Sequence, residues 1–171
     1  AKAIFDLGAK TTLISGPTSI PNPVGPTIVK IKTAAEMSDV CESLLPTDIA
    51  VCAAAVGDYK ISNTSSEKIK KSGTKISIEL EENPDILSRI SKRNSKRPKL
   101  VIGFAAETEN LIFNAELKLK EKGCDWILAN DISNEKVIGK NDNKVHFISR
   151  DEKIEWNSMS KIDVAKKLSK K

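Results

Sequence analysis

An apolar run from Ile49 to Val56 is followed at once by Gly57 and Asp58, and then by a polar loop that ends in lysines. The run does not alternate polar and apolar side chains, which is typical of a parallel strand covered on both faces. We therefore expect a central strand in a parallel sheet. Open α/β sheets bind ligands beyond the carboxyl ends of their strands. Residues 53–58 are thus a candidate floor for a site, and the lysine loop to residue 71 is a candidate lid.

Other apolar stretches predict the remaining strands. Strand patterns occur at residues 11–15, 27–31, 75–80, 99–104 and 126–129, and residues 145–148 and 153–156 predict a hairpin added to the sheet edge. Residues 75–80 alternate with period two, so we expect that strand to have one wet face.

Capping signals predict where the helices begin. Thr33 and Glu36 form a capping box, followed by apolar residues at helical spacing up to Pro46. Asn83, Pro84 and Asp85 predict a second start, with Asn83 as the cap and Pro84 at the first helical position.

Two further helices are expected, at residues 109–122 and around residues 162–168. No repeat or linker divides the chain, so we predict one three-layer α/β domain, residues 1–171, with a mostly parallel sheet. The first eight residues are typical of a helix that ends at Gly8. We therefore expect the domain to lack an amino-terminal segment.

Composition narrows the class of protein. Of the 171 residues, 39% are hydrophobic and 30% are charged, and no apolar run approaches the ~18 residues of a membrane span. We expect a cytosolic protein, because no signal-peptide pattern is present. Cys41, Cys52 and Cys124 are widely spaced in apolar patterns, which predicts buried reduced thiols instead of metal ligands.

The net charge of +5 is compatible with a nucleic acid, an anionic small molecule or solubility alone. Many basic residues fall in residues 92–97 and 166–171, which are typical of solvated loops and tails. Aromatic residues make up only 4% of the chain, which leaves few surfaces on which bases can stack. We expect no nucleic-acid partner and no membrane partner.

Polar side chains follow three predicted strands: Asp58, Glu107, and Asn130 with Asp131. The strand-end rule brings them to one edge of the sheet. Lysines that can meet them are Lys68, Lys70 and Lys71 of the loop and some on helix 109–122.

At 100° per residue, Lys122 lies on the buried side of that helix, Lys118 at the edge of that side and Lys120 towards solvent. A lysine on a buried side either extends its amine to solvent or meets an anion, and both alternatives remain open.

Lysines that face carboxylates suggest a polyanionic ligand with a divalent cation, such as a triphosphate with Mg²⁺. The helix start at residues 83–85 offers backbone N–H groups to such a ligand, or is an ordinary capped helix. The chain has neither a G-x-G-x-x-G nor a Walker motif. His146 is the only histidine, and we expect it to be structural.

Six motifs together resemble bacterial phosphopantothenate–cysteine ligase (phosphopantothenoylcysteine synthetase), often the carboxy-terminal half of a bifunctional coenzyme A biosynthesis protein. They are AAAVGDY (residues 53–59), KIKK (68–71), NPDIL (83–87), GFAAET (103–108), the helix with Lys118 and Lys122, and ANDI (129–132). The resemblance also includes SGPT (15–18), so it covers essentially the whole chain.

The resemblance implies a Rossmann-like homodimer that activates 4′-phosphopantothenate with CTP and Mg²⁺ as an acyl-cytidylate, releasing pyrophosphate. The amine of cysteine then attacks and gives the amide and CMP. The preference for CTP over ATP rests on the resemblance alone. It also implies a possible fusion to a flavin-dependent decarboxylase domain.

The resemblance assigns site residues in three groups. Nucleotide contacts are Asp58, Lys68, Pro84, Asp85, Ile86, Leu87, Phe104, Lys118 and Lys122; further substrate contacts are Ala54, Ala55 and Asn130; the catalytic residue is Lys68, on a flexible flap. No metal ligand is assigned.

One departure from the family concerns its amino-terminal portion, which has a glycine-bearing phosphate loop and an N-x-S-S-G motif. Residues 63–66 look similar to that motif but lie in the flap, so its role is not transferred to them. We expect a fragment of the family's domain. The alternative is a non-catalytic nucleotide-binding or regulatory module of the same fold.

Overall fold

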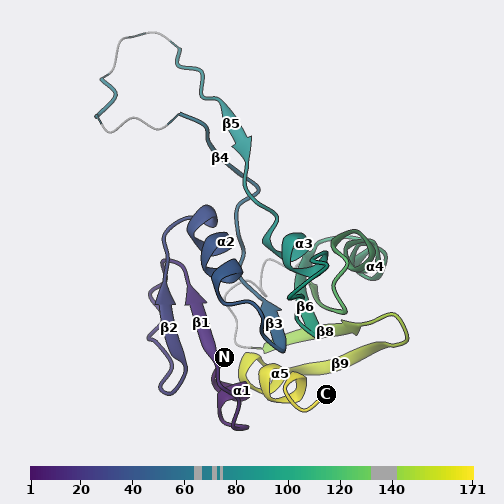
Figure 1. Ribbon diagram of the computed structural model, residues 1–171. Helices are drawn as coiled ribbons and strands as arrows, with labels where there is room; N and C mark the ends of the chain where they lie inside the picture. Colours follow the sequence, from purple (N-terminus) through teal and green to yellow (C-terminus); the bar gives the residue numbers. More distant parts are fainter. Residues whose placement is uncertain (64–66, 71–72, 74, 132–141) are drawn as a thin grey trace.

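The computed structural model describes residues 1–63, 67–70, 73, 75–131 and 142–171 (Figure 1). The strands are β1 (Thr12–Ser15), β2 (Thr27–Lys30), β3 (Ile49–Cys52), β4 (Tyr59–Ile61), β5 (Leu80–Glu82), β6 (Leu100–Glu107), β7 (Trp126–Asp131), β8 (Asp142–Ile148) and β9 (Lys153–Ser160). The helices are α1 (Lys2–Phe5), α2 (Ala34–Ser43), α3 (Ile86–Ser91), α4 (Leu111–Lys122) and α5 (Lys161–Leu168). No helix in these described ranges is long and apolar enough to cross a membrane.

The main sheet has the strand order β3-β6-β7-β8-β9 among the described residues. Strands β3, β6 and β7 are parallel, whereas β8 and β9 are antiparallel to their neighbours. The parallel part and the added hairpin were both predicted from the sequence, and both are confirmed. Strands β1 and β2 form a separate parallel pair, and β4 pairs with β5 in a third, antiparallel sheet.

Two apolar cores lie on opposite faces of the main sheet. One core packs α2, α3 and α4 on the sheet; its buried members are Ile86, Ile90, Val101, Ala105, Ala115, Cys124, Ile127, Ala129 and Ile148. The other packs α5 on the sheet around Ile102, Leu128, Val145, Phe147, Trp156 and Val164. Because helices cover both faces, the three-layer α/β prediction is confirmed.

Strand β3 lies at the edge of the main sheet, so the prediction of a central strand covered on both faces is wrong. Ala50 and Cys52 pack into the core beneath α3 and α4. Ile49 and Val51, on the other face, are 47% and 38% exposed. The sequence of β3 does not alternate because both of its faces are apolar, although one of them is partly exposed.

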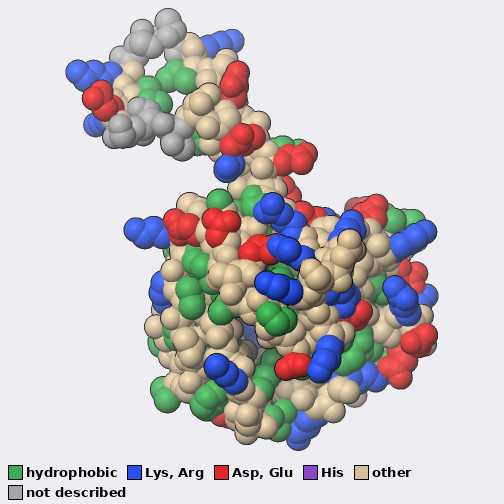
Figure 2. All heavy atoms as spheres, in the orientation of Figure 1, with side chains coloured by type: hydrophobic (Ala, Val, Ile, Leu, Met, Phe, Trp, Pro, Cys, Tyr) green, Lys and Arg blue, Asp and Glu red, His purple; other side chains and the backbone are tan. Residues whose placement is uncertain are grey.

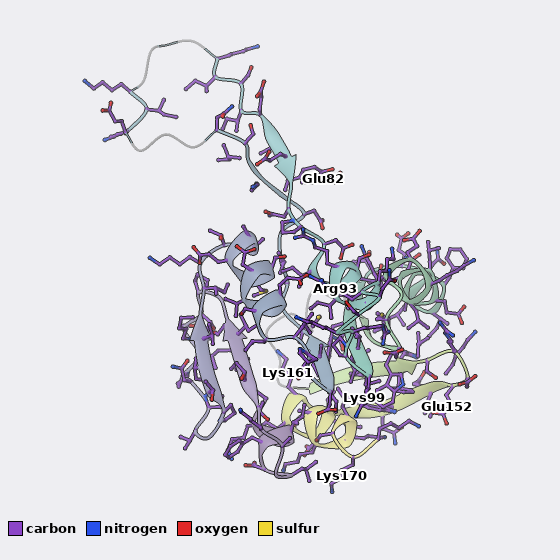
Figure 3. The ribbon with its side chains drawn as sticks, viewed as in Figure 1. Glu82, Arg93, Lys99, Glu152, Lys161 and Lys170 are labelled. Atoms are coloured by element: carbon purple, nitrogen blue, oxygen red, sulfur yellow. The ribbon has the colours of Figure 1, made fainter. Side chains whose placement is uncertain are left out.

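Strands β4 and β5 form the root of an arm, residues 59–82, that projects from the body of the molecule (Figure 1). Glu82 marks the point where this arm meets the body (Figure 3). The prediction of a strand at residues 75–80 is wrong in position. The observed strand is β5, Leu80–Glu82, which pairs with Tyr59–Ile61. Ile76 and Ile78 are exposed. The described residues of the arm form no second layer against which an alternating pattern can bury one face.

The start of α2 agrees with the capping-box prediction. The Thr33 hydroxyl accepts the backbone N–H of Glu36 at 3.1 Å, and the Glu36 carboxylate accepts the N–H of Lys32 at 2.6 Å. Glu42 near the end of this helix forms an ion pair with Arg93, which lies in the body just after α3 (Figure 3). Helix α2 is thereby fastened to the region of α3.

Gly103 allows α3 to approach strand β6 closely. A Cβ atom at this position would lie 2.7 Å from Leu87 Cδ2 and 2.8 Å from Ile127 Cδ1. Contacts this short are not tolerated between carbon atoms, so Leu87 occupies the space that a side chain at residue 103 would need. This packing sets the position of α3 over the sheet.

Arg97 ties the loop before β6 to the ends of two helices. Its guanidinium donates to the carbonyls of Ser91, Pro98 and Gly123 and to both carboxylate oxygens of Asp125. The Asp125 carboxylate also accepts the N–H of Val101 at 2.7 Å. The ends of α3 and α4 are therefore held against the start of β6.

We predict that Gly103→Ala lowers the free energy of unfolding by about 1 to 3 kcal/mol, because the added methyl group must displace Leu87 or Ile127. Urea unfolding followed by circular dichroism measures the change. Gly16→Ala is the matched control, since its nearest neighbour would be Ile31 Cδ1 at an ordinary 3.7 Å. An equal loss of stability in both variants would contradict the packing argument.

Candidate functional site

The candidate site begins where the chain leaves β3 and meets the segment that enters α3. The backbone N–H of Asn83 donates to the carbonyl of Asp58 at 2.8 Å, and its side-chain amide donates to the carbonyl of Gly57 at 2.9 Å. The sequence predicts Asn83 as the helix cap, and this prediction is wrong. Asn83 instead fastens the loop after β3 to the residues before α3.

Asp85 is the N-cap of α3 and also contacts α4. Its Oδ1 accepts the N–H of Ser88 at 3.0 Å, while its Oδ2 accepts from Lys122 Nζ at 2.6 Å. Pro84 consequently precedes the cap, and the first helical residue is Ile86. The Asn83 amide binds the Gly57 carbonyl in the loop after β3, and Asp85 takes the capping position.

The Asp85–Lys122 pair changes the pKa of both groups. Partial burial acts to raise the pKa of Asp85, but bonds from Lys122 and from the Ser88 N–H outweigh it, so the pKa lies below its usual 3.8. The hydrogen bond to Asp85 raises the pKa of Lys122 above its usual 10.5, and the charges of Glu121 and Asp58 add to the effect. Asp58 is thus within electrostatic reach of the same ammonium group.

The face of α4 agrees with the prediction from helical geometry. Leu111, Ile112 and Leu119 pack on the core, Lys118 and Lys122 are half-buried, and Lys120 is exposed. The sequence left open whether Lys122 reaches solvent or an anion. In the structure the anion is a carboxylate of the protein itself. Basic side chains and carboxylates gather on the body where the arm leaves it (Figure 2).

Three free thiols lie close to this site. Burial raises the pKa of Cys52 to about 12, and the charges of Cys41, Cys124 and Asp85 contribute. Cys124 is buried, whereas Cys41 and Cys52 are half-buried, and no disulfide joins them. The prediction that the three thiols are buried is therefore confirmed for Cys124 and wrong for Cys41 and Cys52. In the part of the chain that the structure describes, no group of three His, Cys, Asp or Glu residues is arranged for a metal ion.

Phe104 and Asn130 belong to the opposite face of the sheet. Phe104 packs with the core under α5 and pairs in register with Leu128. Side chains alternate along a strand, so Asn130 shares the face of Leu128. The structure therefore does not place these two side chains beside Asp85 and Lys122 on the α3–α4 face. The Oδ1 atom of Asn130 is buried and has no hydrogen-bond partner among the described residues.

Lys68 is exposed and belongs to the arm between β4 and β5, which projects away from the body (Figure 1). The structure does not bring it to Asp58, Asp85 or Lys122. Ala54 and Ala55 are exposed and follow β3 in the loop that leads to Asp58.

The expected meeting of strand ends is partly confirmed. Glu107 and Asp131 are partners in register across β6 and β7. The Glu107 carboxylate accepts a hydrogen bond of 3.3 Å from the side-chain amide of Asn114, which lies in the first part of α4. Asp58 lies six residues beyond β3 and joins the α3–α4 group through Asn83. The described part of ANDI ends at Asp131, and residues 64–66 and 71 of the flap prediction also lie outside the described residues.

His146 is separate from the candidate site. It lies on β8, and its Nε2 is 3.8 Å from a carboxylate oxygen of Glu155 on β9. Both residues border a cavity of about 340 Å³ at the hairpin, with apolar neighbours such as Ile112 and Ile154. The expectation of a structural histidine agrees with this position.

The two contacts that define the candidate site were not predicted from the sequence. They are the bonds of Asn83 to the loop after β3 and the pairing of Asp85 with Lys122. The only sequence signal for the second was the position of Lys122 on the buried side of its helix.

The fold and the site together define an α/β domain with a mixed acidic and basic site where the loop after β3, the start of α3 and the end of α4 meet. The family described as "DNA/pantothenate metabolism flavoprotein C-terminal domain" has a model that matches residues 1–171, and the chain belongs to this family.

Individual relatives agree with this assignment. The chain is 40% identical over 173 residues to the coenzyme A biosynthesis bifunctional protein CoaBC of Borreliella burgdorferi, covering 99% of this chain and 43% of the relative. It is 36% identical to the protein of the same name from Haemophilus influenzae, covering 96% of this chain and 41% of that protein. The chain thus spans less than half the length of these relatives.

Among solved structures, the C-terminal domain of a CoaBC protein has a TM-score of 0.76 and 32% identity, covering 98% of this chain and 77% of that one. The fold is also similar to that of the Cab2 mutant H337A in complex with phosphopantothenate-cysteine. That match has a TM-score of 0.60 and 15% identity, and covers 84% of this chain and 50% of that one.

We predict that the Asp85–Lys122 pair stabilises the fold only where both groups are charged. Asp85→Asn keeps an oxygen that caps Ser88 but removes the charge. It should cost about 0.2 to 1 kcal/mol near neutral pH, a small effect because the Asp85 side chain is 43% exposed.

The contribution of Asp85 is present above its unfolded pKa of 3.8 and is lost as the pH falls through the lower folded value. That of Lys122 is present below 10.5 and is lost as the pH rises through its raised value. Urea unfolding near pH 7 and near pH 3 measures the difference from wild type, which should be smaller at the acid end. Asp48→Asn, which breaks the more exposed pair with Lys99, is the control. A pH-independent difference would contradict the prediction.

Proposed function

We propose that this chain is the ligase domain of a coenzyme A biosynthesis protein and joins 4′-phosphopantothenate to cysteine with CTP. The observation that carries the proposal is that Asp85 pairs with Lys122 beside the loop that carries Asp58, although the three residues lie far apart in the sequence. These are three of the nucleotide contacts implied by the resemblance. The family match over the whole chain supports the same activity.

The proposed reaction has two steps. The carboxylate of 4′-phosphopantothenate attacks the α-phosphate of CTP, which forms an acyl-cytidylate and releases pyrophosphate. The amine of cysteine then attacks the acyl carbon, an amide forms and CMP leaves. The structure of the Cab2 mutant, which holds phosphopantothenate-cysteine, is of the same fold and supports a substrate of this class.

In this proposal the residues of the chain bind and orient the nucleotide. Lys118 and Lys122 are half-buried cations on α4, and Lys122 contacts Asp85 in the segment from Pro84 to Leu87. Lys68 is the proposed catalytic residue, because a lysine offsets the charge that develops on an acyl phosphate. Since Lys68 lies on the projecting arm, this role requires the arm to approach a site.

Mg²⁺ is the proposed cofactor. This ion is usually held by one or two carboxylates together with substrate phosphates, so a cluster of three protein ligands is not needed. Asp58 fits such a role, since its carboxylate is exposed and forms no ion pair among the described residues. When bound, the ion neutralises phosphate charge.

We further propose a homodimer in the cytosol, with the domain fused to a flavin-dependent decarboxylase as in a bifunctional protein. The CoaBC relatives, described as bifunctional and more than twice as long as their matched part, support the fusion.

A non-catalytic nucleotide-binding module is the second candidate function. The position of Lys68, away from Asp85 and Lys122, favours it (Figure 1). Calorimetry with CTP and a pyrophosphate assay separate the two: a module binds CTP without turnover.

We predict that the full-length polypeptide containing these residues releases pyrophosphate when given CTP, Mg²⁺, 4′-phosphopantothenate and cysteine. Lys68→Gln should abolish turnover and leave CTP affinity largely intact, because the lysine acts at the acyl-transfer step. A coupled pyrophosphate assay and calorimetry measure the two quantities.

Lys75→Gln, which removes another exposed lysine of the same arm, is the control and should retain turnover. Release of no pyrophosphate by the wild type would refute the ligase, and full turnover by Lys68→Gln would remove Lys68 from the mechanism.

A further inference from the structure

We infer that Asp85 is a positioning residue, which holds the ammonium group of Lys122 in place for a phosphate oxygen of the nucleotide and does not itself contact the ligand. The inference rests on the proposed function. The resemblance assigned a nucleotide contact to Asp85 without naming an atom, and the inference excludes its carboxylate from that contact.

Both oxygens of the Asp85 carboxylate bind groups of the protein. One oxygen accepts the N–H of Ser88 at 3.0 Å and the other accepts from Lys122 at 2.6 Å. An unpaired carboxylate beside a triphosphate would repel it, so pairing with Lys122 removes an unfavourable interaction. The negative charge of Asp85 is tolerated here because it is paired with the ammonium group of Lys122.

Lys122 retains the capacity to bind a ligand while it is paired. An ammonium group has three N–H donors, and Asp85 accepts from one of its hydrogens. The Lys122 side chain is 32% exposed, so the group is neither sealed in the core nor free in solvent. Two donors therefore remain for the oxygens of an anion.

The ends of two helices restrict where this ammonium group can lie. Lys122 is the last residue of α4, where the helix dipole favours a cation. Asp85 is fixed as the cap of α3, and α3 is fixed on β6 by Leu87 over Gly103. A flexible lysine chain is thus held at a point set by two packed helices.

Three charged groups and the thiol of Cys52 lie within electrostatic reach of the pair. Asp58 after β3 and Glu121 on α4 act on Lys122. Lys92 after α3 acts on Asp85, and the Cys52 thiol on β3 lies near the same carboxylate. Among the described residues, Asp58 is an acidic side chain from a different segment that acts on Lys122, so it must be held constant when Asp85 is tested.

A purely structural ion pair would change stability but not nucleotide affinity, so affinity is the deciding measurement. The experiment is a double-mutant cycle on CTP binding, measured by calorimetry with wild type, Asp85→Asn, Lys122→Gln and the double variant. Asn still caps the helix, because its side-chain oxygen accepts the Ser88 N–H, and each variant's fold is checked by thermal unfolding.

Lys122→Gln should weaken CTP binding roughly 10- to 100-fold, the range for a lost charged hydrogen bond. Asp85→Asn should weaken it about 3- to 5-fold, and should have no further effect in the Lys122→Gln background. Lys120→Gln and Asp48→Asn make the same changes of charge at exposed positions and should leave affinity within about twofold.

An equal effect of Asp85→Asn with and without Lys122 would overturn the inference, because Asp85 would then act on the ligand directly. Unchanged or tighter binding by Asp85→Asn would overturn it as well. Failure of the proposed function is a different result: CTP binds with the expected coupling, but no pyrophosphate is released. Absence of CTP binding in the wild type would refute both.

Discussion

The close contact between Leu87 and Gly103 is the packing constraint on which the candidate site depends. It lets α3 lie directly on β6, and this sets the height of the helix entrance above the sheet. Arg97 holds the far ends of α3 and α4 at the start of the same strand. The entrance of α3 and the end of α4 are therefore parts of one rigid unit, in which Asp85 and Lys122 meet.

The site is a junction of three chain segments that polar contacts join. Asn83 binds the loop after β3, Asp85 caps α3, and the same carboxylate reaches Lys122 on α4. The contacts of Asn83 and Lys122 join segments that are remote in the sequence. A cation with further N–H donors is thereby presented beside the loop that follows β3.

Local patterns predicted most elements, and the errors have a common cause. The capping box at Thr33, the exposed side of α4 at Lys120 and the hairpin of β8 and β9 follow from spacing alone, and each is observed. The errors concern neighbours that spacing does not specify. An apolar run does not show whether another strand lies on each side, so β3 was placed in the centre. An alternating run does not show whether a layer covers it, so residues 75–80 were predicted as a strand.

By itself, the sequence determined the α/β class, the order of most helices and strands, and the motifs that link the chain to its family, because these depend on local spacing and residue type. Only the tertiary structure decided which polar groups meet. Asn83 binds the loop after β3 instead of capping α3, and Lys122 pairs with Asp85. Both contacts depend on distances between segments remote in sequence. The tertiary structure also separated Lys68 on the arm, and Phe104 on the opposite face, from that pair. Packing against β6 sets the position of α3, which carries Asp85, and such packing is not encoded in any one motif.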